Sequence, residues 1–473
     1  MNREIQPTGK QKEVLALPPV GHTVVLGTAG SGKTTMALFR AIGLANLPNK
    51  PRVLVVTFNT ALVQYMSNIC KVQLPNLTIE NYHKFARGYL HSIGKMPGWG
   101  GILQNKDDYV EMALKEIKQI YPDESTLKRP LSAYLDEIAF IEKFGIQNEE
   151  QYYQVERIGR AAMNIRRENR KWIYMVYNRY REIRRNNGIN YDWDDIALYV
   201  YEGLLEDKKP RRYQHIIVDE GQDFSPMMLR SLIEAVGTGG SFSFFGDVSQ
   251  QIYGGRLSWR DAGIKIGERG IWRFKKNYRN EGTIALFAKD ITKSKYWEKN
   301  ADAVEADEMV AMGPKPILVR FDTEQREMEW VVELLKQKRS EGSSNVVVCR
   351  THEILNSIRK KLVNAGIHPT MIDKTNGGYC VGQTVYLTTY HTVKGLEFDN
   401  VFMPMLSADK FPDKEKVEQA VSADVVKADE LKLLYVAATR AKFGLFMSYH
   451  RELTELFPMH SAYCDYVEGA DII

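Results

Sequence analysis

The sequence Val24-Val25-Leu26-Gly27-Thr28-Ala29-Gly30-Ser31-Gly32-Lys33-Thr34, residues 24–34, predicts a buried strand, a glycine-rich turn and the start of a helix. In such a loop the backbone N–H groups face inward and the helix adds the positive end of its dipole, so the loop binds phosphate. Lys33 can reach the β- and γ-phosphates of a nucleotide, and the Thr34 hydroxyl can ligate Mg²⁺. The stretch therefore predicts an α/β fold with a nucleoside triphosphate site.

Three other apolar runs, residues 53–56, 216–218 and 242–245, each end in polar residues. In an open parallel sheet, ligands bind beyond the carboxyl ends of the strands, so we expect these polar residues at the same edge as the loop. Asp219 and Glu220 follow the second run. Beside a phosphate loop, Asp219 can hold the hydrated Mg²⁺, and Glu220 can orient or deprotonate the water that attacks the phosphate.

The pattern of predicted elements divides the chain into several parts, as its length of 473 residues favours. Residues 88–187 have long amphipathic helical patterns without a convincing strand, which predicts a helical subdomain inserted into the first α/β unit. Residues 293–316 are rich in charge and small residues and separate this part from a second α/β unit. The second unit has no phosphate loop of its own.

One predicted helical segment, residues 156–185, combines basic and aromatic residues. Such a mixture suits phosphates and unstacked bases. An amphipathic helix is the alternative, because apolar residues recur at spacings of three and four and would form a buried stripe. We expect that stripe to be core, and both a nucleic-acid face and a plain solvated face remain open for the arginines. The stripe consists of Ile173, Val176, Tyr180 and Ile183, and the basic residues are Arg157, Arg160, Arg166, Arg167, Arg170, Lys171, Arg179, Arg181, Arg184 and Arg185.

Composition adds limits on location and partners. The 64 Lys and Arg exceed the 59 Asp and Glu by only five, too few to identify a nucleic-acid binder from net charge alone. The four cysteines form no CxxC pair, as expected of reduced thiols in a cytosolic protein. Neither a signal peptide nor a membrane span is apparent. We therefore expect a cytoplasmic protein without membrane contact.

A series of motifs in fixed order resembles the superfamily 1 DNA helicases of the UvrD, Rep and PcrA type. The motifs are GTAGSGKT, VTFNTA, NYHKFA, IIVDEGQD, FGDVSQQIYG, NYR, TTYHTVKGLEF and YVAATRA, between about residues 11 and 448. The resemblance implies two RecA-like α/β cores with ATP and Mg²⁺ between them. We expect the first core at residues 1–87 and 190–270, the helical insert at 88–189 and the second core at 271–473.

The resemblance also implies roles for individual residues. In the nucleotide site, it assigns Gln11 to the adenine, Tyr278 to base stacking, Gln250 to sensing the γ-phosphate, Arg279 and Arg440 to arginine fingers, and Glu397 to the ribose, with Gly395 in the same motif. Along the DNA path, it assigns contacts with single-stranded DNA to Thr57, Phe58, Asn59, Tyr82, His83, Tyr253, Arg256 and His391. Hydroxyls, amides and cations suit phosphates, and the aromatic rings suit bases.

The chain departs from these relatives in three places. Thr35 stands where many carry an arginine that covers the adenine, which predicts looser base selectivity. Gly255 stands where a tryptophan often stacks on DNA, and we consider Trp259 as its replacement. Between the predicted helix at 355–365 and the strand at 385, relatives insert a large helical subdomain, whereas this chain has only residues 366–384.

Two functions follow from the resemblance. The first is an ATP-dependent translocase and helicase, with 3′ to 5′ polarity, acting on single-stranded or tailed duplex DNA. The second is a DNA- and nucleotide-sensing ATPase subunit that regulates a partner nuclease, as compact relatives do in bacterial antiviral systems; the short connection at 366–384 motivates it. DNA repair and antiphage defence are both compatible pathways, and an RNA helicase is a third, weaker interpretation.

Overall fold

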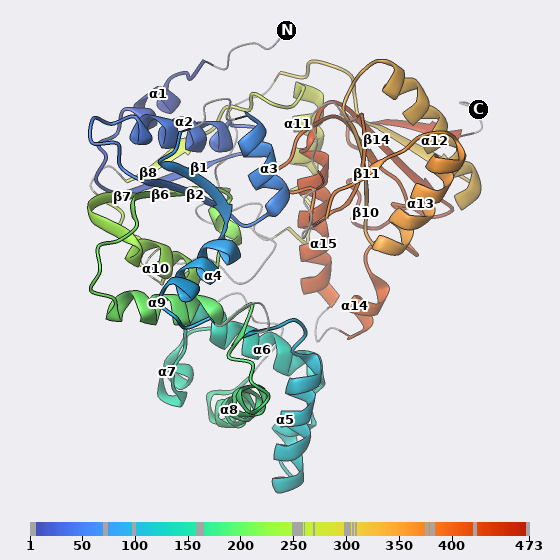
Figure 1. Ribbon diagram of the computed structural model, residues 1–473. Helices are drawn as coiled ribbons and strands as arrows, with labels where there is room; N and C mark the ends of the chain where they lie inside the picture. Colours follow the sequence, from blue (N-terminus) through green and yellow to red (C-terminus); the bar gives the residue numbers. More distant parts are fainter. Residues whose placement is uncertain are drawn as a thin grey trace.

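The computed structural model describes the chain in the ranges 6–69, 74–96, 101–157, 165–247, 259, 261–267, 270–297, 304, 307, 310–373, 378, 384–419 and 423–469. Two parallel sheets lie side by side, and a group of helices extends from the first of them (Figure 1). The predicted fold class, two RecA-like α/β cores with a helical insert, is confirmed.

The first sheet consists of parallel strands in the order β3 (Leu77–Asn81), β2 (Val53–Thr57), β6 (Tyr213–Val218), β7 (Val236–Gly246), β1 (Gly21–Gly27) and β8 (Ile271–Phe274). The central strands β2, β6, β7 and β1 contain the apolar runs predicted above. Their carboxyl ends meet at one edge, where the phosphate loop follows β1. Strand β8 pairs with β1 and so carries this sheet past residue 270, where the sequence placed the end of the first core.

Helices cover both faces of this sheet (Figure 1). On one face are α4 (Tyr82–Ser92), α9 (Ile196–Glu206) and α10 (Pro226–Glu234); on the other are α1 (Lys10–Leu15), α2 (Lys33–Ala45) and α3 (Thr60–Ile69). Because successive strand residues point to opposite faces, Val24 and Leu26 pack with the first group and Val25 with the second. Burial on both faces explains why the strand reads as an unbroken apolar run.

Between α4 and α9 the chain forms a separate helical unit with its own apolar core. Its elements are α5 (Asp107–Ile120), α6 (Leu131–Phe144), α7 (Glu149–Gln154), α8 (Arg170–Asn186) and a short parallel pair, β4 (Ile102–Leu103) and β5 (Tyr191–Asp192). The predicted stripe of α8, including Ile173 and Val176, is fully buried in this core. The interpretation of that stripe as core is therefore confirmed.

The second sheet is parallel throughout. Its order is β11 (Thr370–Met371), β12 (Val385–Thr389), β10 (Asn345–Cys349), β13 (Phe398–Met403), β14 (Ala441–His450), β9 (Ile317–Phe321) and β15 (Asp465–Glu468). One face packs against α12 (Glu324–Ser340) and α13 (His352–Asn364), and the other against α11 (Gly282–Ile291) and α15 (Ala423–Ala438), which follows α14 (Lys414–Gln419). Ala61 of α3 is buried in the second of these layers, so the two cores pack directly together.

Candidate functional site

The glycine-rich loop lies between β1 and α2. Gly30 and Gly32 have φ angles of +73° and +80°, which side-chain-bearing residues rarely adopt. A Cβ atom on Gly30 would also lie 2.2 Å from Asn277 Oδ1. The backbone N–H of Tyr278 donates to the Gly30 carbonyl at 2.8 Å. The loop therefore needs glycine both for its backbone and for its close contact with the segment after β8.

Lys33 is buried at the start of α2, and its side chain returns into the loop. Its Nζ donates to the carbonyl oxygens of Gly27 (2.8 Å) and Thr28 (2.7 Å) and lies 3.9 Å from Asp247 Oδ2. Burial lowers the pKa of Lys33, although the charges of Asp247 and Glu220 oppose this effect. The cavity at the loop has a volume of about 10 Å³, room for about one water. We therefore expect a triphosphate to draw the ammonium away from these carbonyls.

Several buried polar atoms of the site have no hydrogen-bond partner among the described residues. They include the hydroxyl oxygens of Thr28 and Ser31 and the Oδ2 atom of Asp219. The Thr34 hydroxyl hydrogen-bonds the Asp219 carboxyl, and burial together with the charge of Glu220 raises the pKa of Asp219 to about 7. Carboxylate and hydroxyl oxygens are ligands that Mg²⁺ prefers. The residues at this position thus fit the metal that the sequence predicts.

Glu220 follows Asp219 in the turn after β6 and has a left-handed backbone, with φ at +51°. Burial alone would raise the pKa of its carboxyl. The positive charges of Lys394, Lys33 and Arg440 outweigh that effect and hold the pKa below its ordinary value. Glu220 is therefore ionised at neutral pH, as a group that orients or deprotonates water must be.

Two arginines from outside the first sheet line the same cavity as the loop and Glu220. Arg279 belongs to the segment after β8, and Arg440 to the turn before β14. The structure thus brings together residues that are more than 400 positions apart in the sequence, from Lys33 to Arg440. Gln250, the predicted γ-phosphate sensor, lies outside the described residues.

The arginines are held by groups of the second core. Arg279 donates to Glu397 from Nε at 2.8 Å and from Nη2 at 2.5 Å, so the predicted ribose contact is engaged with an arginine in this conformation. Arg440 is 1% exposed, and burial lowers its pKa to about 10. Gly395, in the same motif as Glu397, has φ at +82° and lies against Leu62 of α3.

The residues predicted to surround the base lie on the outer side of the loop. Gln11 donates from Nε2 to the Ser31 carbonyl at 3.0 Å, and its Oε1 accepts from the Thr8 N–H at 3.0 Å. Tyr278 is 50% exposed, and its hydroxyl lies 2.7 Å from the Thr8 hydroxyl. Thr35 is half-buried in the first turn of α2.

Four of the residues predicted to contact DNA are half-buried at the edge where the cores meet. The rings of Phe58 and His83 pack edge to face with centroids 5.9 Å apart. Asn59 donates from Nδ2 to the Thr392 carbonyl of the second core at 3.1 Å, and His391 precedes that residue. The edge therefore contains side chains from both cores.

Two other predicted contacts need correction. Thr57 and Tyr82 are 0% exposed. The Tyr82 ring packs into the core beneath the first sheet, and its hydroxyl hydrogen-bonds Ser231 Oγ at 2.7 Å. Neither side chain can reach DNA in this conformation, because each completes the interior. Tyr253 and Arg256 lie outside the described residues.

The predicted tryptophan replacement also has a different role. The Trp259 ring packs edge to face on Phe244, with centroids 5.2 Å apart, at the margin of the first core's interior. It is therefore a packing residue in this conformation rather than an exposed wedge. Gly255 lies outside the described residues.

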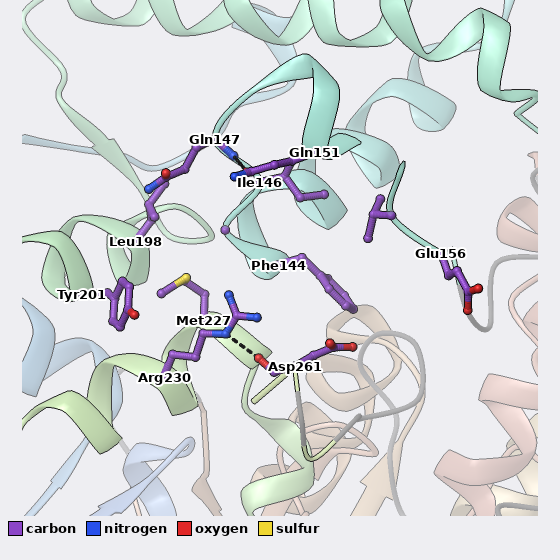
Figure 2. Close-up of a pocket in the computed structure, with 12 residues that line it drawn as sticks. Phe144, Ile146, Gln147, Gln151, Glu156, Leu198, Tyr201, Met227, Arg230 and Asp261 are labelled. Atoms are coloured by element: carbon purple, nitrogen blue, oxygen red, sulfur yellow. Dashed lines mark hydrogen bonds between the residues drawn. The ribbon is translucent and has the colours of Figure 1, made fainter. Parts of the chain in front are cut away.

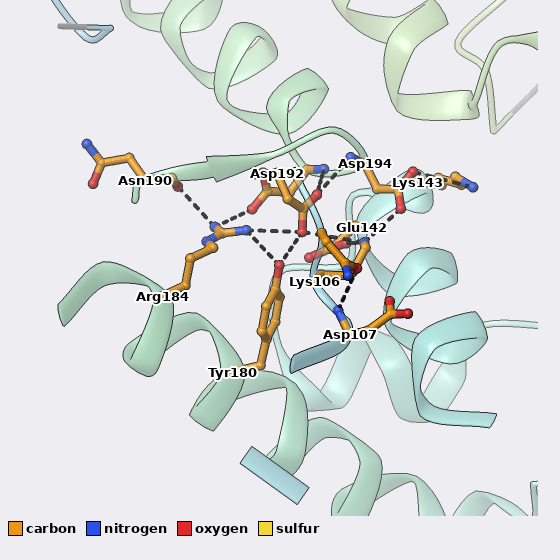
Figure 3. Close-up of polar contacts among 11 residues, drawn as sticks. Lys106, Asp107, Glu142, Lys143, Tyr180, Arg184, Asn190, Asp192 and Asp194 are labelled. Atoms are coloured by element: carbon orange, nitrogen blue, oxygen red, sulfur yellow. Dashed lines mark hydrogen bonds and ion pairs between the residues drawn. The ribbon is translucent and has the colours of Figure 1, made fainter. Parts of the chain in front are cut away.

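Several basic residues of the 156–185 segment are structural. Arg184 is fully buried and contacts Asp192 (3.1 Å) and Asp195 (2.5 Å). Lys106 lies 2.8 Å from Glu142 and 2.7 Å from Asp194 (Figure 3). We call this group the insert cluster: Lys106, Glu142, Arg184, Asp192, Asp194 and Asp195.

Two further arginines of this segment face inward. Arg170 donates to backbone carbonyls of residues 152, 153 and 155, and Arg157 pairs with Glu137 at 2.7 Å. For these residues and Arg184, the nucleic-acid interpretation is corrected, because their charges neutralise or cap groups of the insert itself. Arg160 lies outside the described residues.

A larger cavity, of about 460 Å³, lies between the helical insert and α9 and α10 (Figure 2). Its wall includes Phe144 and Gln151 from the insert and Met227 and Arg230 from the first core. None of the residues predicted for nucleotide or DNA lines it. Size alone therefore does not mark the site in this molecule.

Sequence reasoning missed three contacts that shape the site. Asp247 is the carboxylate nearest Lys33, Gln222 accepts from the Asp247 N–H at 2.8 Å, and Lys394 pairs with Asp223 at 2.6 Å. All four residues lie within the motifs quoted above. Their positions after strand ends were a usable signal, but their partners were not readable from local pattern.

No helix in the described part of the chain is long and apolar enough to cross a membrane.

Comparison with known proteins agrees with the motif order. The model of the UvrD/REP helicase N-terminal domain matches residues 8–278, and that of the UvrD-like helicase C-terminal domain matches residues 272–376 and 378–452. A Mycoplasma pneumoniae protein named "Probable DNA helicase" is 25% identical over 90% of this chain and 80% of its own length. DNA helicase II of Haemophilus influenzae is 28% identical over 60% of this chain and 40% of its own. For one component of an ATP-dependent helicase/nuclease from Lactococcus lactis, the values are 26%, 46% and 19%.

Proposed function

The chain belongs to the UvrD/Rep helicase family, and from that premise we propose that it hydrolyses ATP to move 3′ to 5′ along single-stranded DNA and to separate DNA strands. One observation supports this most. Lys33 and Glu220 of the first core line a single cavity with Arg279 and Arg440, which come from outside the first sheet. Complete transition-state stabilisation then requires both cores, so hydrolysis is coupled to their relative position.

Each residue has a role in this proposal. Lys33 and the two arginines neutralise charge that spreads over the γ-phosphoryl oxygens, and Glu220 orients and deprotonates the attacking water. Asp219 and Thr34 would hold Mg²⁺, which supplies further neutralisation of phosphate charge when bound. Tyr278, with Gln11 beneath it, offers an exposed ring for the base.

We further propose that the single strand crosses the edge formed by Phe58, Asn59, His83 and His391. Rings there can stack on bases, and the amide and imidazoles can contact phosphates. Opening and closing of the cleft would shift the grip on the strand between the cores. The domain limits remain those proposed from the sequence, with β8 added to the first core.

Steady-state ATP hydrolysis with and without an oligothymidylate tests the proposal. We expect strong stimulation by the oligonucleotide in the wild-type protein and loss of turnover in Lys33→Ala. A wild-type chain that binds ATP but shows no stimulation would overturn motor activity. Unwinding of duplexes with a 3′ or a 5′ tail tests the direction, and opening of 5′-tailed substrates alone would contradict the proposed polarity.

The regulatory alternative is less favoured, because every nucleotide-site residue proposed above that the structure describes has chemistry suited to hydrolysis. The helicase/nuclease component from Lactococcus lactis matches 46% of this chain, which keeps a partner nuclease worth testing. Co-purification discriminates between the two. A monomer that unwinds tailed duplexes unaided would count against a purely regulatory role.

A further inference from the structure

The turn after β12, residues 389–396, lies directly against the first core. It is compact: the hydroxyls of Thr389 and Thr392 lie 3.1 Å apart, and the Thr389 carbonyl accepts from the N–H groups of Thr392 (3.1 Å) and Val393 (3.0 Å). Thr392, Val393 and Lys394 are all buried. A turn so tightly bonded moves as a unit.

This turn has two contacts near the proposed DNA edge. Asn59 donates to the Thr392 carbonyl at 3.1 Å, while its Oδ1 accepts from the Ala61 N–H at 2.8 Å. Leu62 packs so closely that a Cβ atom on Gly395 would lie 2.9 Å from its side chain. A strand that engages Asn59 or His391 therefore acts on the turn itself.

The third contact leads to the hydrolytic carboxylate. Lys394 Nζ lies 2.6 Å from Asp223 Oδ1, and the two side chains are only 5% and 6% exposed. The Asp223 N–H donates to the Glu220 carbonyl at 3.0 Å, closing the turn that carries Glu220. Among the charges around Glu220, that of Lys394 has the largest effect on its carboxyl. One buried ion pair thus joins the DNA-side turn to the Glu220 turn.

We propose that Lys394 is a positioning residue that transmits DNA engagement to hydrolysis through its ion pair with Asp223. The inference rests on the proposed motor function. A displacement of the 389–396 turn moves Lys394, and because the pair is buried and direct, Asp223 and the adjoining Glu220 follow. The pair therefore carries the DNA-dependent part of ATP turnover rather than ATP binding.

Turnover of full-length variants with and without saturating oligothymidylate tests this inference. In Lys394→Met and in Asp223→Asn, we expect the ratio of stimulated to unstimulated turnover to fall about tenfold, with the KM for ATP changed by less than about twofold. The double variant should be no worse than the worse single one, because both remove the same link. Lys394→Arg should retain part of the stimulation. Lys410→Met, which removes a lysine paired with Glu324 inside the second core, is the matched control and should behave as wild type.

An equal loss of turnover with and without DNA would overturn the proposal, since it would show a purely structural role. So would an unchanged stimulation ratio in Asp223→Asn, whose near-isosteric change keeps the test valid if Lys394→Met melts early. A wild-type chain without stimulation would instead refute the proposed function, and with it this inference.

Discussion

The nucleotide cavity and the insert cluster both bury several charges, yet they arrange them differently. In the insert cluster, cations touch carboxylates directly, and Lys106 lies within 3.4 Å of all three carboxylates that are close enough together to hold a metal. In the nucleotide cavity, Lys33 donates to backbone carbonyls. Within the described part of the chain, neither Asp219 nor Glu220 forms an ion pair.

This difference separates a structural cluster from a binding site. A buried cation and carboxylate in contact satisfy each other, and such a group holds elements together. When they are kept apart, the interaction is left for a ligand that carries both phosphate charge and a metal. Buried charge by itself is therefore a poor indicator of function, whereas separated buried charge is a good one.

The largest effect should come from Glu220→Gln. The amide keeps the shape of the side chain but cannot accept a proton, so we expect kcat to fall by about 10²- to 10⁴-fold while ATP still binds. Single-turnover hydrolysis and nucleotide affinity measure the two quantities. Loss of ATP binding or a large drop in melting temperature would contradict the distinction, because Glu220 would then be a structural group like those of the insert cluster.

Arg184→Met should have the opposite profile. It leaves Asp192 and Asp195 buried without their cation, which should cost about 3–5 kcal/mol of folding free energy in the insert. Thermal or urea unfolding measures the loss. Arg179→Met on the same helix is the control, since Arg179 pairs with surface residues Glu116 and Glu182 and should leave the unfolding midpoint unchanged. A drop in turnover by Arg184→Met without any change in unfolding would contradict a structural role.

The sequence predicts well those elements that are buried on both faces. Strands β1, β2 and β6 read as apolar runs because helices cover both sides. The edge strands β3 and β15 were not predicted. Every residue of β3 is half-buried, and most of β15 is exposed. Their sequences mix polar and apolar residues, because an edge strand has less interior to fill.

The same contrast holds for the site. The phosphate loop, Asp219 and Glu220 follow from local pattern, because each requires a residue type at a fixed distance from a strand end. The contact of Lys394 with Asp223 joins residues 171 positions apart, and no local period encodes it. Spacing likewise identified the apolar stripe of α8, but which arginine is buried depends on where β5 places Asp192. Packing between distant elements had to be seen.

A moderate effect is expected at the margin of the nucleotide cavity. Gln11→Ala removes hydrogen bonds to the Ser31 carbonyl and the Thr8 N–H, which should raise the KM for ATP about three- to tenfold with little change in kcat. Lys12→Ala, at the exposed neighbouring position, is the control. A fall in kcat without a change in KM would place Gln11 among the groups that act in the transition state instead.

The smallest effect concerns a third buried group, around His450, and extends the comparison to pH. His450 Nδ1 lies 2.7 Å from Glu327 Oε2, and this hydrogen bond raises the pKa of His450 more than burial lowers it. Asp409 and Glu324 add to the increase. Because the folded pKa exceeds the unfolded one, the stabilisation is complete below about pH 6.5 and is lost as the pH rises through the folded value. The difference in melting temperature between the wild type and His450→Gln should therefore shrink between pH 6 and pH 8. A difference that grows with pH would mean that the neutral imidazole is the stabilising form, and that this group does not rely on contact between opposite charges as the insert cluster does.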